Sequence, residues 1–164
     1  MDYMLYMVTI TIYLKIYRMQ LNYFIYLITP FCAWLIAGCL KFFINSIKAK
    51  KLAFGLVGYG GMPSNHSAIV SSTTALIAFK EGLNTPAFGV ALTLSFIVLL
   101  DANSLRQQVG KHAKAINTLS ENLIIKPNLR ERMGHTRLEI LGGIITGICV
   151  AYLLYIVSTM KCWI

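Results

Sequence analysis

Four long apolar runs, separated by short polar stretches, restrict the fold of this chain more than any other feature. They cover residues 24–47, 67–79, 87–100 and 140–157. A helix crosses a bilayer with ~20 apolar residues, and only helices and closed barrels satisfy their own backbone hydrogen bonds there. Apolar residues make up 57% of the chain and charged residues 13%, against roughly 45–50% and about 25% in soluble domains. The sequence therefore predicts an all-α integral membrane helical bundle with about four spans and short re-entrant or interfacial helices.

The two middle runs are shorter than a full span, so we expect their ends to extend into the polar motifs beside them. Polar side chains at the ends of such helices would lie inside the bundle. This arrangement favours a site at the edge of the membrane. The turn over residues 80–86, rich in polar residues, separates the two runs.

Residues 1–20 stand apart from the single membrane-embedded domain that we predict over residues 21–164. The stretch is apolar as far as residue 14, but Asp2 interrupts it and no basic residue precedes the apolar part, so it makes a poor signal peptide. An interfacial helix, a fifth span and a true start at Met19 all remain open. We favour a peripheral or partly inserted helix.

The junction at residues 60–67, Gly-Gly-Met-Pro-Ser-Asn-His-Ser, has the composition of an anion site. Pro63 and Ser64 end whatever precedes them, and Ser64 or Asn65 can cap the helix that follows. The first free N–H groups of that helix would then point outward beside His66. Phosphate is the ligand expected at such a site.

A second histidine lies in the stretch Gly-His-Thr-Arg-Leu-Glu at residues 134–139. Glu139 follows His135 by four residues, so both side chains share one face if the stretch is helical. A histidine held by a carboxylate, together with a histidine beside an anion nest, suits nucleophilic and acid–base roles.

Basic side chains are distributed unevenly between the two ends of the predicted bundle, in a chain whose formal net charge is +9. Ten fall after the first and third runs and four fall at the other end, so the positive-inside rule places the ten, and both histidine motifs, in the cytoplasm. No nucleic-acid-binding module is visible, and we expect no nucleic-acid partner. The ten are Lys48, Lys50, Lys51, Arg106, Lys111, Lys114, Lys126, Arg130, Arg132 and Arg137; the four are Lys15, Arg18, Lys80 and Lys161.

Between residues 110 and 133, apolar side chains recur at helical spacing, which predicts an amphipathic helix that is either an interfacial lid or a packed connector. In the last run, Gly143 and Gly147 allow a close helix contact, which we interpret as internal packing rather than dimerisation, although a homo-oligomer stays possible. The four cysteines are interpreted as small core residues: Cys32, Cys39, Cys149 and Cys162.

The chain resembles the divergent branch of the type 2 phosphatidic acid phosphatase family, which is related to acid phosphatases and vanadium-dependent haloperoxidases. The resemblance covers about residues 24–157. It rests on the junction at 60–67, on Asp101-Ala102 followed by Arg106, and on the stretch at 134–139.

The wider superfamily carries Lys-x6-Arg-Pro, then Pro-Ser-Gly-His, then Ser-Arg-x5-His-x3-Asp. In this chain Lys48 stands in the first arginine place, Asn65 replaces the glycine, and Leu129 stands in the second arginine place, with Arg130 one residue further on. The positions that match are Lys41, Pro63, Ser64, His66 and His135, with Glu139 as the acidic partner.

The resemblance implies a membrane phosphatase that hydrolyses a lipid phosphate monoester or pyrophosphate through a phosphohistidine. His135 would be the nucleophile, Glu139 would hold its tautomer, and His66 would be the acid and base. No cofactor and no metal is implied, and the expected partners are the lipid phosphate and membrane lipids of the cell membrane. The phosphate-binding residues would be Lys41, Lys48, Ser64, Asn65, Arg106 and Arg130.

Other interpretations of the same residues stay open. A non-catalytic protein that binds or transports anionic lipids could use the same basic pocket. Lys41 can instead snorkel from a helix end, and Asp101 is expected to form a structural ion pair with Arg106 or Lys41. His112 is interpreted as ordinary surface. Residues 57–60, Val-Gly-Tyr-Gly, resemble part of a potassium-channel filter but lack a preceding apolar pore helix.

Overall fold

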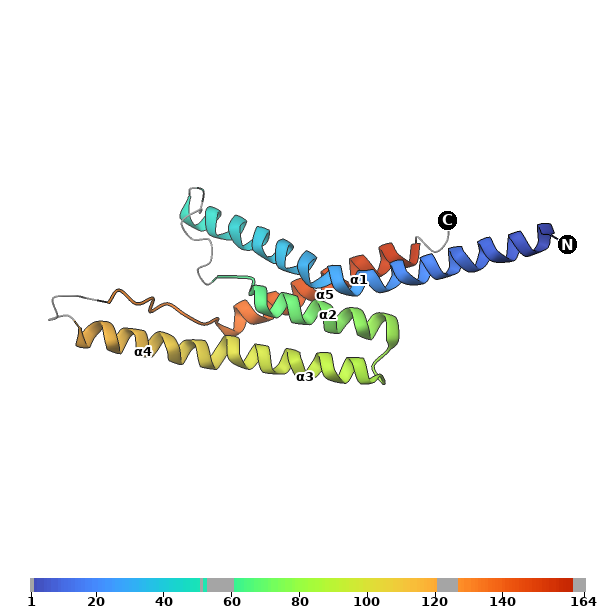
Figure 1. Cartoon of the computed structure of the whole chain (residues 1–164). Coiled ribbons are helices and arrows are strands. Elements are labelled where there is room, and N and C mark those ends of the chain that lie inside the picture. Colours follow the sequence, from blue (N-terminus) through green and yellow to red (C-terminus); the bar gives the residue numbers. More distant parts are fainter. Residues whose placement is uncertain (1, 51, 53–60, 121–126, 161–164) are drawn as a thin grey trace.

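Helices account for nearly all of the regular structure in the computed structural model, which describes residues 2–50, 52, 61–120 and 127–160 (Figure 1). Within that part of the chain there is no strand, so the predicted all-α class is confirmed. The elements are α1 (Asp2–Ala49), α2 (Asn65–Glu81), α3 (Pro86–Leu100), the π turn η2 (Asp101–Leu105), α4 (Arg106–Leu119) and α5 (Arg137–Met160).

Three helical stretches in the described part are long and apolar enough to cross a membrane: Tyr23–Ala49, Pro86–Leu119 and Arg137–Met160. The remaining predicted run forms α2, which has 17 residues and is too short to be counted with them. It contacts α1, α3 and α5, and among the side chains that the structure describes it carries more buried ones than any other helix. The polar turn between α2 and α3 lies where the sequence predicts it, with Thr85 as the N-cap of α3.

Small residues let α5 pack directly on the backbone of α2. A Cβ atom at Gly143 would collide with the carbonyl oxygen of Ser64, and one at Gly147 would collide with that of Ala68. Both glycines are buried. The predicted internal packing of the Gly143 and Gly147 pair is therefore confirmed, because close backbone approach requires the absence of a side chain.

The core at the centre of the bundle consists of small and medium apolar residues from three helices. Ala33 and Ala37 of α1, Ala68 of α2 and Val150 of α5 are buried together, with Cys32 packed against them. Two other cysteines differ from the expectation: Cys39 and Cys149 are exposed on the outer face, where a bilayer would cover them. Cys162 lies outside the described residues.

The first helix shows no boundary near residue 20. The interpretation of residues 1–20 as a peripheral or partly inserted helix stays a prediction. α1 runs without interruption from Asp2 through the first span. The physical reason is that the stretch holds neither glycine nor proline before Pro30, so nothing in it ends a helix. Pro30 itself is accommodated within α1.

The amphipathic helix is also placed differently from the prediction. It is α4, which continues α3 through the π turn and ends at Leu119, whereas the sequence suggested residues 110–133. Residues 127–136, which we call the approach segment, are not helical, because Pro127 and Gly134 both disfavour a helix. Leu123, part of the predicted pattern, lies outside the described residues.

The approach segment is tied to α4 along its length, and the choice between a lid and a connector packed on the bundle stays a prediction. Asn117 donates to the carbonyl oxygen of Leu129 (2.8 Å) and to the Glu131 carboxylate (2.9 Å), and it accepts from the Leu129 amide (3.0 Å). At Gly110 a Cβ atom would collide with the carbonyl oxygen of Glu131. The chain thus runs back along α4 towards the start of α5 (Figure 1).

Candidate functional site

The N-terminal ends of α2 and α5 meet at one point, where the π turn after α3 also passes. Ser64 is the N-cap of α2, as predicted, and its hydroxyl accepts a hydrogen bond from the Ser67 amide at 3.4 Å. The amide of Ser64 donates to the carbonyl oxygen of Glu139 at 2.9 Å. Two helix N-termini, each favourable to negative charge, therefore open towards the same place.

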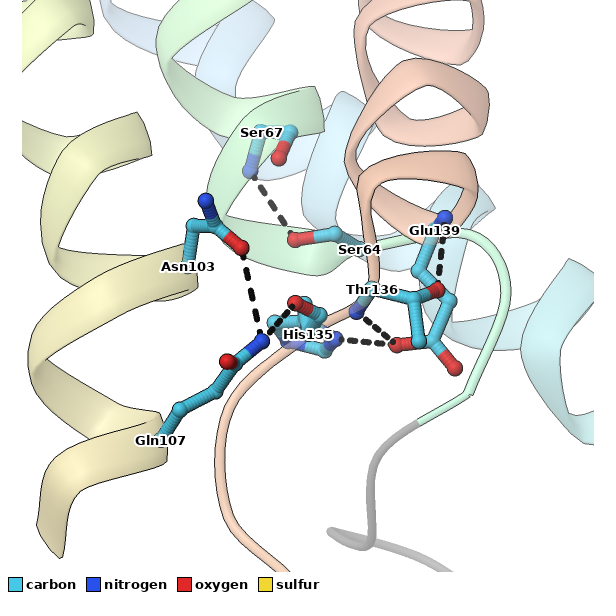
Figure 2. Close-up of polar contacts among 7 residues, drawn as sticks. All are labelled: Ser64, Ser67, Asn103, Gln107, His135, Thr136 and Glu139. Carbon is cyan, nitrogen blue, oxygen red and sulfur yellow. Dashed lines mark hydrogen bonds and ion pairs between the residues drawn. The ribbon is translucent and has the colours of Figure 1, made fainter.

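His135 is buried at this point and is held by Glu139 (Figure 2). Its Nδ1 atom lies 3.0 Å from Oε2 of Glu139, the expected partner, although His135 precedes α5 and the two residues share no helical face. Because Nδ1 faces the carboxylate, Nε2 is the nitrogen left for a substrate. A carboxylate in this place orients the ring and stabilises its protonated form.

Glu139 has a second role that sequence reasoning missed. Its Oε2 atom accepts from the Thr136 amide at 3.1 Å, while the Glu139 amide donates to the Thr136 hydroxyl at 3.3 Å. This reciprocal pair is a capping box at the start of α5, and the pattern Thr-x-x-Glu before an apolar run was the signal for it. Glu139 thus joins the start of the helix to the histidine.

His66 and His135, far apart in the sequence, are neighbours in the structure. Their ring centroids lie 5.8 Å apart and the rings are tilted by 58°. Histidines at this distance can face the same small anion from two sides, as an acid and a nucleophile must.

Three polar atoms at the start of α2 are buried without a hydrogen-bond partner among the described residues: Asn65 Oδ1, His66 Nδ1 and Ser67 Oγ. Buried polar groups are usually paired, and leaving one unpaired costs about 1–3 kcal/mol. The Asn65 amide lies against Gly38 of α1, where a Cβ atom would meet its Nδ2 at 3.9 Å. Unsatisfied polar atoms beside two histidines suit the binding of a polar group.

Arg106 forms the predicted ion pair with Asp101, with 3.4 Å between Nε and Oδ2. The π turn explains the spacing, since the Arg106 amide bonds to the carbonyl oxygen of Asp101 five residues earlier. That wider turn brings residues five apart onto one face, and such turns are frequent at functional sites. Both side chains remain about 40% exposed, which leaves the guanidinium accessible to a ligand.

Positive charge surrounds His66, which lies outside the three candidate spans. Burial lowers the pKa of His66 below its ordinary value, and the nearby charges of Arg106, His135 and Lys41 lower it further, while Asp101 opposes them. Lys41 is half-buried on α1 and is attracted by Glu139. Lys41 and Arg106 therefore lie close enough for their charges to act on His66.

Lys48 and Arg130 are placed further out. Lys48 is exposed in the last turn of α1, about 10 Å along the helix axis from Lys41. Arg130 is exposed on the approach segment, where its Nε donates to the carbonyl oxygen of Arg132 at 3.3 Å. Neither Lys48 nor Arg130 is among the charged groups that shift the pKa of His66. Their phosphate-binding roles stay predictions.

Asn45 is a neighbour of the site that the sequence did not single out. It lies one turn after Lys41 on the same face of α1, and a Cβ atom at Gly61 would meet its Oδ1 at 3.3 Å. Gly61 has a φ of 145°, which favours glycine. The sequence pattern that could have identified Asn45 is the spacing of residues 41, 45 and 48, which places three polar side chains on one face of a helix.

Two other sequence predictions lie away from this point. His112 is exposed on α4, in agreement with its interpretation as ordinary surface. The filter-like residues 57–60 lie outside the described residues.

Comparison with known proteins agrees with the motifs. The sequence profile of the Divergent PAP2 family matches residues 24–150. The chain belongs to the Divergent PAP2 family. It is also 30% identical over 145 residues to the "Uncharacterized membrane protein YuiD" of Bacillus subtilis (strain 168), an alignment that covers 78% of this chain and 92% of that protein. No solved structure matches the chain.

Membership of the Divergent PAP2 family identifies a phosphatase-like membrane protein. The family match spans every element that contributes to the histidine pair, from α1 to the first half of α5.

Proposed function

We propose that this member of the Divergent PAP2 family is a membrane phosphatase that hydrolyses a lipid phosphate monoester or pyrophosphate through a phosphohistidine. One observation carries the proposal: His66 and His135 lie 5.8 Å apart while Glu139 holds His135 at 3.0 Å. A nucleophile with its orienting carboxylate and a second titratable group on the same anion form the minimal set for this chemistry.

In the first step, Nε2 of His135 attacks phosphorus and the bond from phosphorus to the lipid oxygen breaks. His66 donates its proton to the departing oxygen, so that the lipid alcohol leaves neutral. Glu139 stabilises the positive charge that develops on the His135 ring.

In the second step, neutral His66 accepts a proton from water, and the water oxygen attacks the phosphohistidine. The bond between phosphorus and nitrogen breaks, inorganic phosphate leaves, and His135 is regenerated. His66 is again protonated and ready for the next substrate.

The phosphoryl oxygens carry most of the charge during both steps. Lys41, Arg106 and the first main-chain N–H groups of α2, which follow the engaged Ser64 amide, supply the opposing charge and hydrogen bonds. We assign Lys48 and Arg130 to the outer part of the same basic surface, where they attract the substrate.

The position of the site favours a lipid substrate over a soluble one. His66 lies in the first turn of α2 and His135 lies just before α5, while the apolar remainder of both helices continues into the bundle (Figure 1). A lipid tail would lie beside the apolar helices with its phosphate at the helix ends. We further propose a multi-pass location in the cell membrane with the site facing the cytoplasm, because the basic residues gather at that end.

Two observations favour a second candidate, a non-catalytic protein that binds or transports anionic lipids. Arg106 is engaged with Asp101, and Leu129 stands in a place where the wider superfamily carries an arginine. Both features reduce the positive charge available to the transferred phosphoryl group.

Phosphate release by the purified protein in mixed micelles separates the two candidates. The panel would contain lysophosphatidate, a diacyl phosphatidate, an isoprenyl monophosphate and an isoprenyl pyrophosphate, with His135→Ala as the control. Release by the parent but not by His135→Ala supports the phosphatase. Binding of these lipids without release by either protein would favour the second candidate.

A further inference from the structure

The main chain of His135 is bonded on both sides to residues at the junction of α3 and α4, and Figure 2 shows the bond from Gln107. The His135 amide donates to the carbonyl oxygen of Ala102 in the π turn at 3.0 Å. Nε2 of Gln107, in the first turn of α4, donates to the carbonyl oxygen of His135 at 3.2 Å. Both main-chain polar groups of His135 therefore bond to one short stretch, residues 102–107.

The orientation of the Gln107 amide follows from its partners. Its Nε2 also donates to Oδ1 of Asn103 at 3.4 Å, one turn earlier on the same helix. The carbonyl oxygen of His135 can only accept, so the nitrogen of Gln107 must face it. Asn103 thus supports the donor that reaches His135.

Gly134 allows the approach segment to lie this close to α4. Its φ is 86°, and a Cβ atom there would stand 2.7 Å from Cγ and 3.0 Å from the amide nitrogen of Gln107. Any other residue would be strained and would push the segment away from Gln107. The position of His135 therefore depends on contact between Gly134 and Gln107.

We propose that Gln107 is a positioning residue, which fixes the main chain of His135 so that its ring keeps one orientation between Glu139 and His66. Glu139 holds the ring and Gln107 holds the backbone that carries it, so the two contacts together define where Nε2 points. The effect on turnover rests on the proposed phosphatase function, whereas the effect on His135 itself does not. Misplacement of a reacting group by about 1 Å can lower a rate ~10²-fold.

Three substitutions test this role. Gln107→Leu keeps the approximate size and removes the donor, while Gln107→Lys restores an N–H donor of similar reach. Gln108→Leu is the matched control, because Gln108 is the adjacent glutamine and its side chain is exposed. Asn103→Ala removes the supporting acceptor and leaves Gln107 in place, which keeps a test available if Gln107→Leu does not fold.

The first readout is the rate at which diethyl pyrocarbonate modifies His135, followed by mass spectrometry and normalised to exposed His112. We expect the rate to rise about 5- to 10-fold in Gln107→Leu, less in Asn103→Ala, and not in Gln108→Leu, because a loosened main chain opens the buried ring. In Gln107→Lys, the rate of His135 modification should return most of the way to that of the parent protein. An unchanged rate in both Gln107→Leu and Asn103→Ala would overturn the proposal.

The second readout is turnover of a lipid phosphate. We expect Gln107→Leu to lower kcat by roughly 10- to 100-fold with KM changed less than about 2-fold, since the loss concerns the reacting atom rather than lipid binding. A raised KM with unchanged kcat would overturn the positioning role. If the parent has no activity while His135 still becomes reactive in Gln107→Leu, the positioning role holds and the phosphatase function fails.

Discussion

The amide of Ser64 donates a hydrogen bond to the carbonyl oxygen of Glu139 at 2.9 Å, which ties the first residue of one helix start to the first turn of another. His66 follows Ser64 by two residues, and His135 precedes Glu139 by four. This main-chain contact therefore joins the two helix starts beside which the histidines lie. It also explains why α2 and α5 need the glycine contacts that bring their backbones together.

The two roles of Glu139 can be separated by a pair of substitutions. Glu139→Gln can still accept from the Thr136 amide, so folding should change little, but it loses the charge that stabilises protonated His135. We expect phosphate release to fall roughly 10²–10⁴-fold. Thr136→Ala should mainly affect stability. We expect it to lower the free energy of unfolding by about 0.5–2 kcal/mol and to lower activity less than Glu139→Gln does. Equal effects of both substitutions on activity would contradict the assigned role of Glu139.

The histidines should differ in a phosphoenzyme experiment. His135→Ala should form no acid-labile phosphoenzyme, because it lacks the nucleophile. His66→Ala should still become labelled by an aryl phosphate, whose leaving group needs no proton, and should then release phosphate slowly. Rapid-quench labelling with ³²P measures both steps. Labelling of His135→Ala at the parent's level would exclude His135 as the nucleophile.

The contact between α2 and α5 predicts a local cost for any side chain at Gly143. Gly143→Ala should lower the free energy of unfolding by about 1–3 kcal/mol, because its Cβ would collide with the Ser64 carbonyl oxygen. Gly89→Ala on α3 is the matched control, with nothing within 4 Å of its Cβ. Thermal unfolding in detergent compares the two. A Gly143→Ala protein as stable as the parent would show that the helices can separate freely.

The pH dependence of turnover follows from the lowered pKa of His66. Burial and neighbouring positive charges favour the neutral ring, so the protonated form needed by an acid is lost as pH rises through a value below the ordinary 6.5. With an alkyl lipid phosphate, kcat/KM should therefore fall on the alkaline side of that value. Lys41→Gln should move the fall to higher pH, because it removes one of the positive charges. With an aryl phosphate, kcat/KM should show no such fall. A fall of kcat/KM with that substrate too would assign the titration to another group.

The sidedness of the site can be measured by cysteine labelling in a background without native cysteines. Lys50→Cys and Lys114→Cys lie at the end of the bundle that holds the histidines, and Asn84→Cys lies between α2 and α3 at the other end. We expect an impermeant maleimide added to intact cells to label Asn84→Cys only. Labelling of the two lysine positions from outside would place the site on the opposite face of the membrane.

Much of this arrangement can be predicted from short stretches of the sequence. Apolar runs define helices, Ser64 marks where one of them begins, and His135 and Glu139, four residues apart, were expected to lie in contact. The pair Asp101 and Arg106 and the close contact at Gly143 and Gly147 were also predictable. All of these depend on neighbours in the sequence or on helical periodicity, which a single chain displays directly.

Other features depended on contacts between distant segments. The continuation of α3 into α4 through the π turn, the non-helical approach segment and the hold of Gln107 on His135 join residues 102–107 to residues 134 and 135. No periodicity encodes such a contact, because its free energy comes from packing and hydrogen bonds that exist only once the helices have assembled. The sequence alone determined which side chains could bind or react with a phosphate and at which helix ends they lie. Tertiary structure decided that His66 and His135 meet, because only the packing of α2 on α5 brings those two ends together.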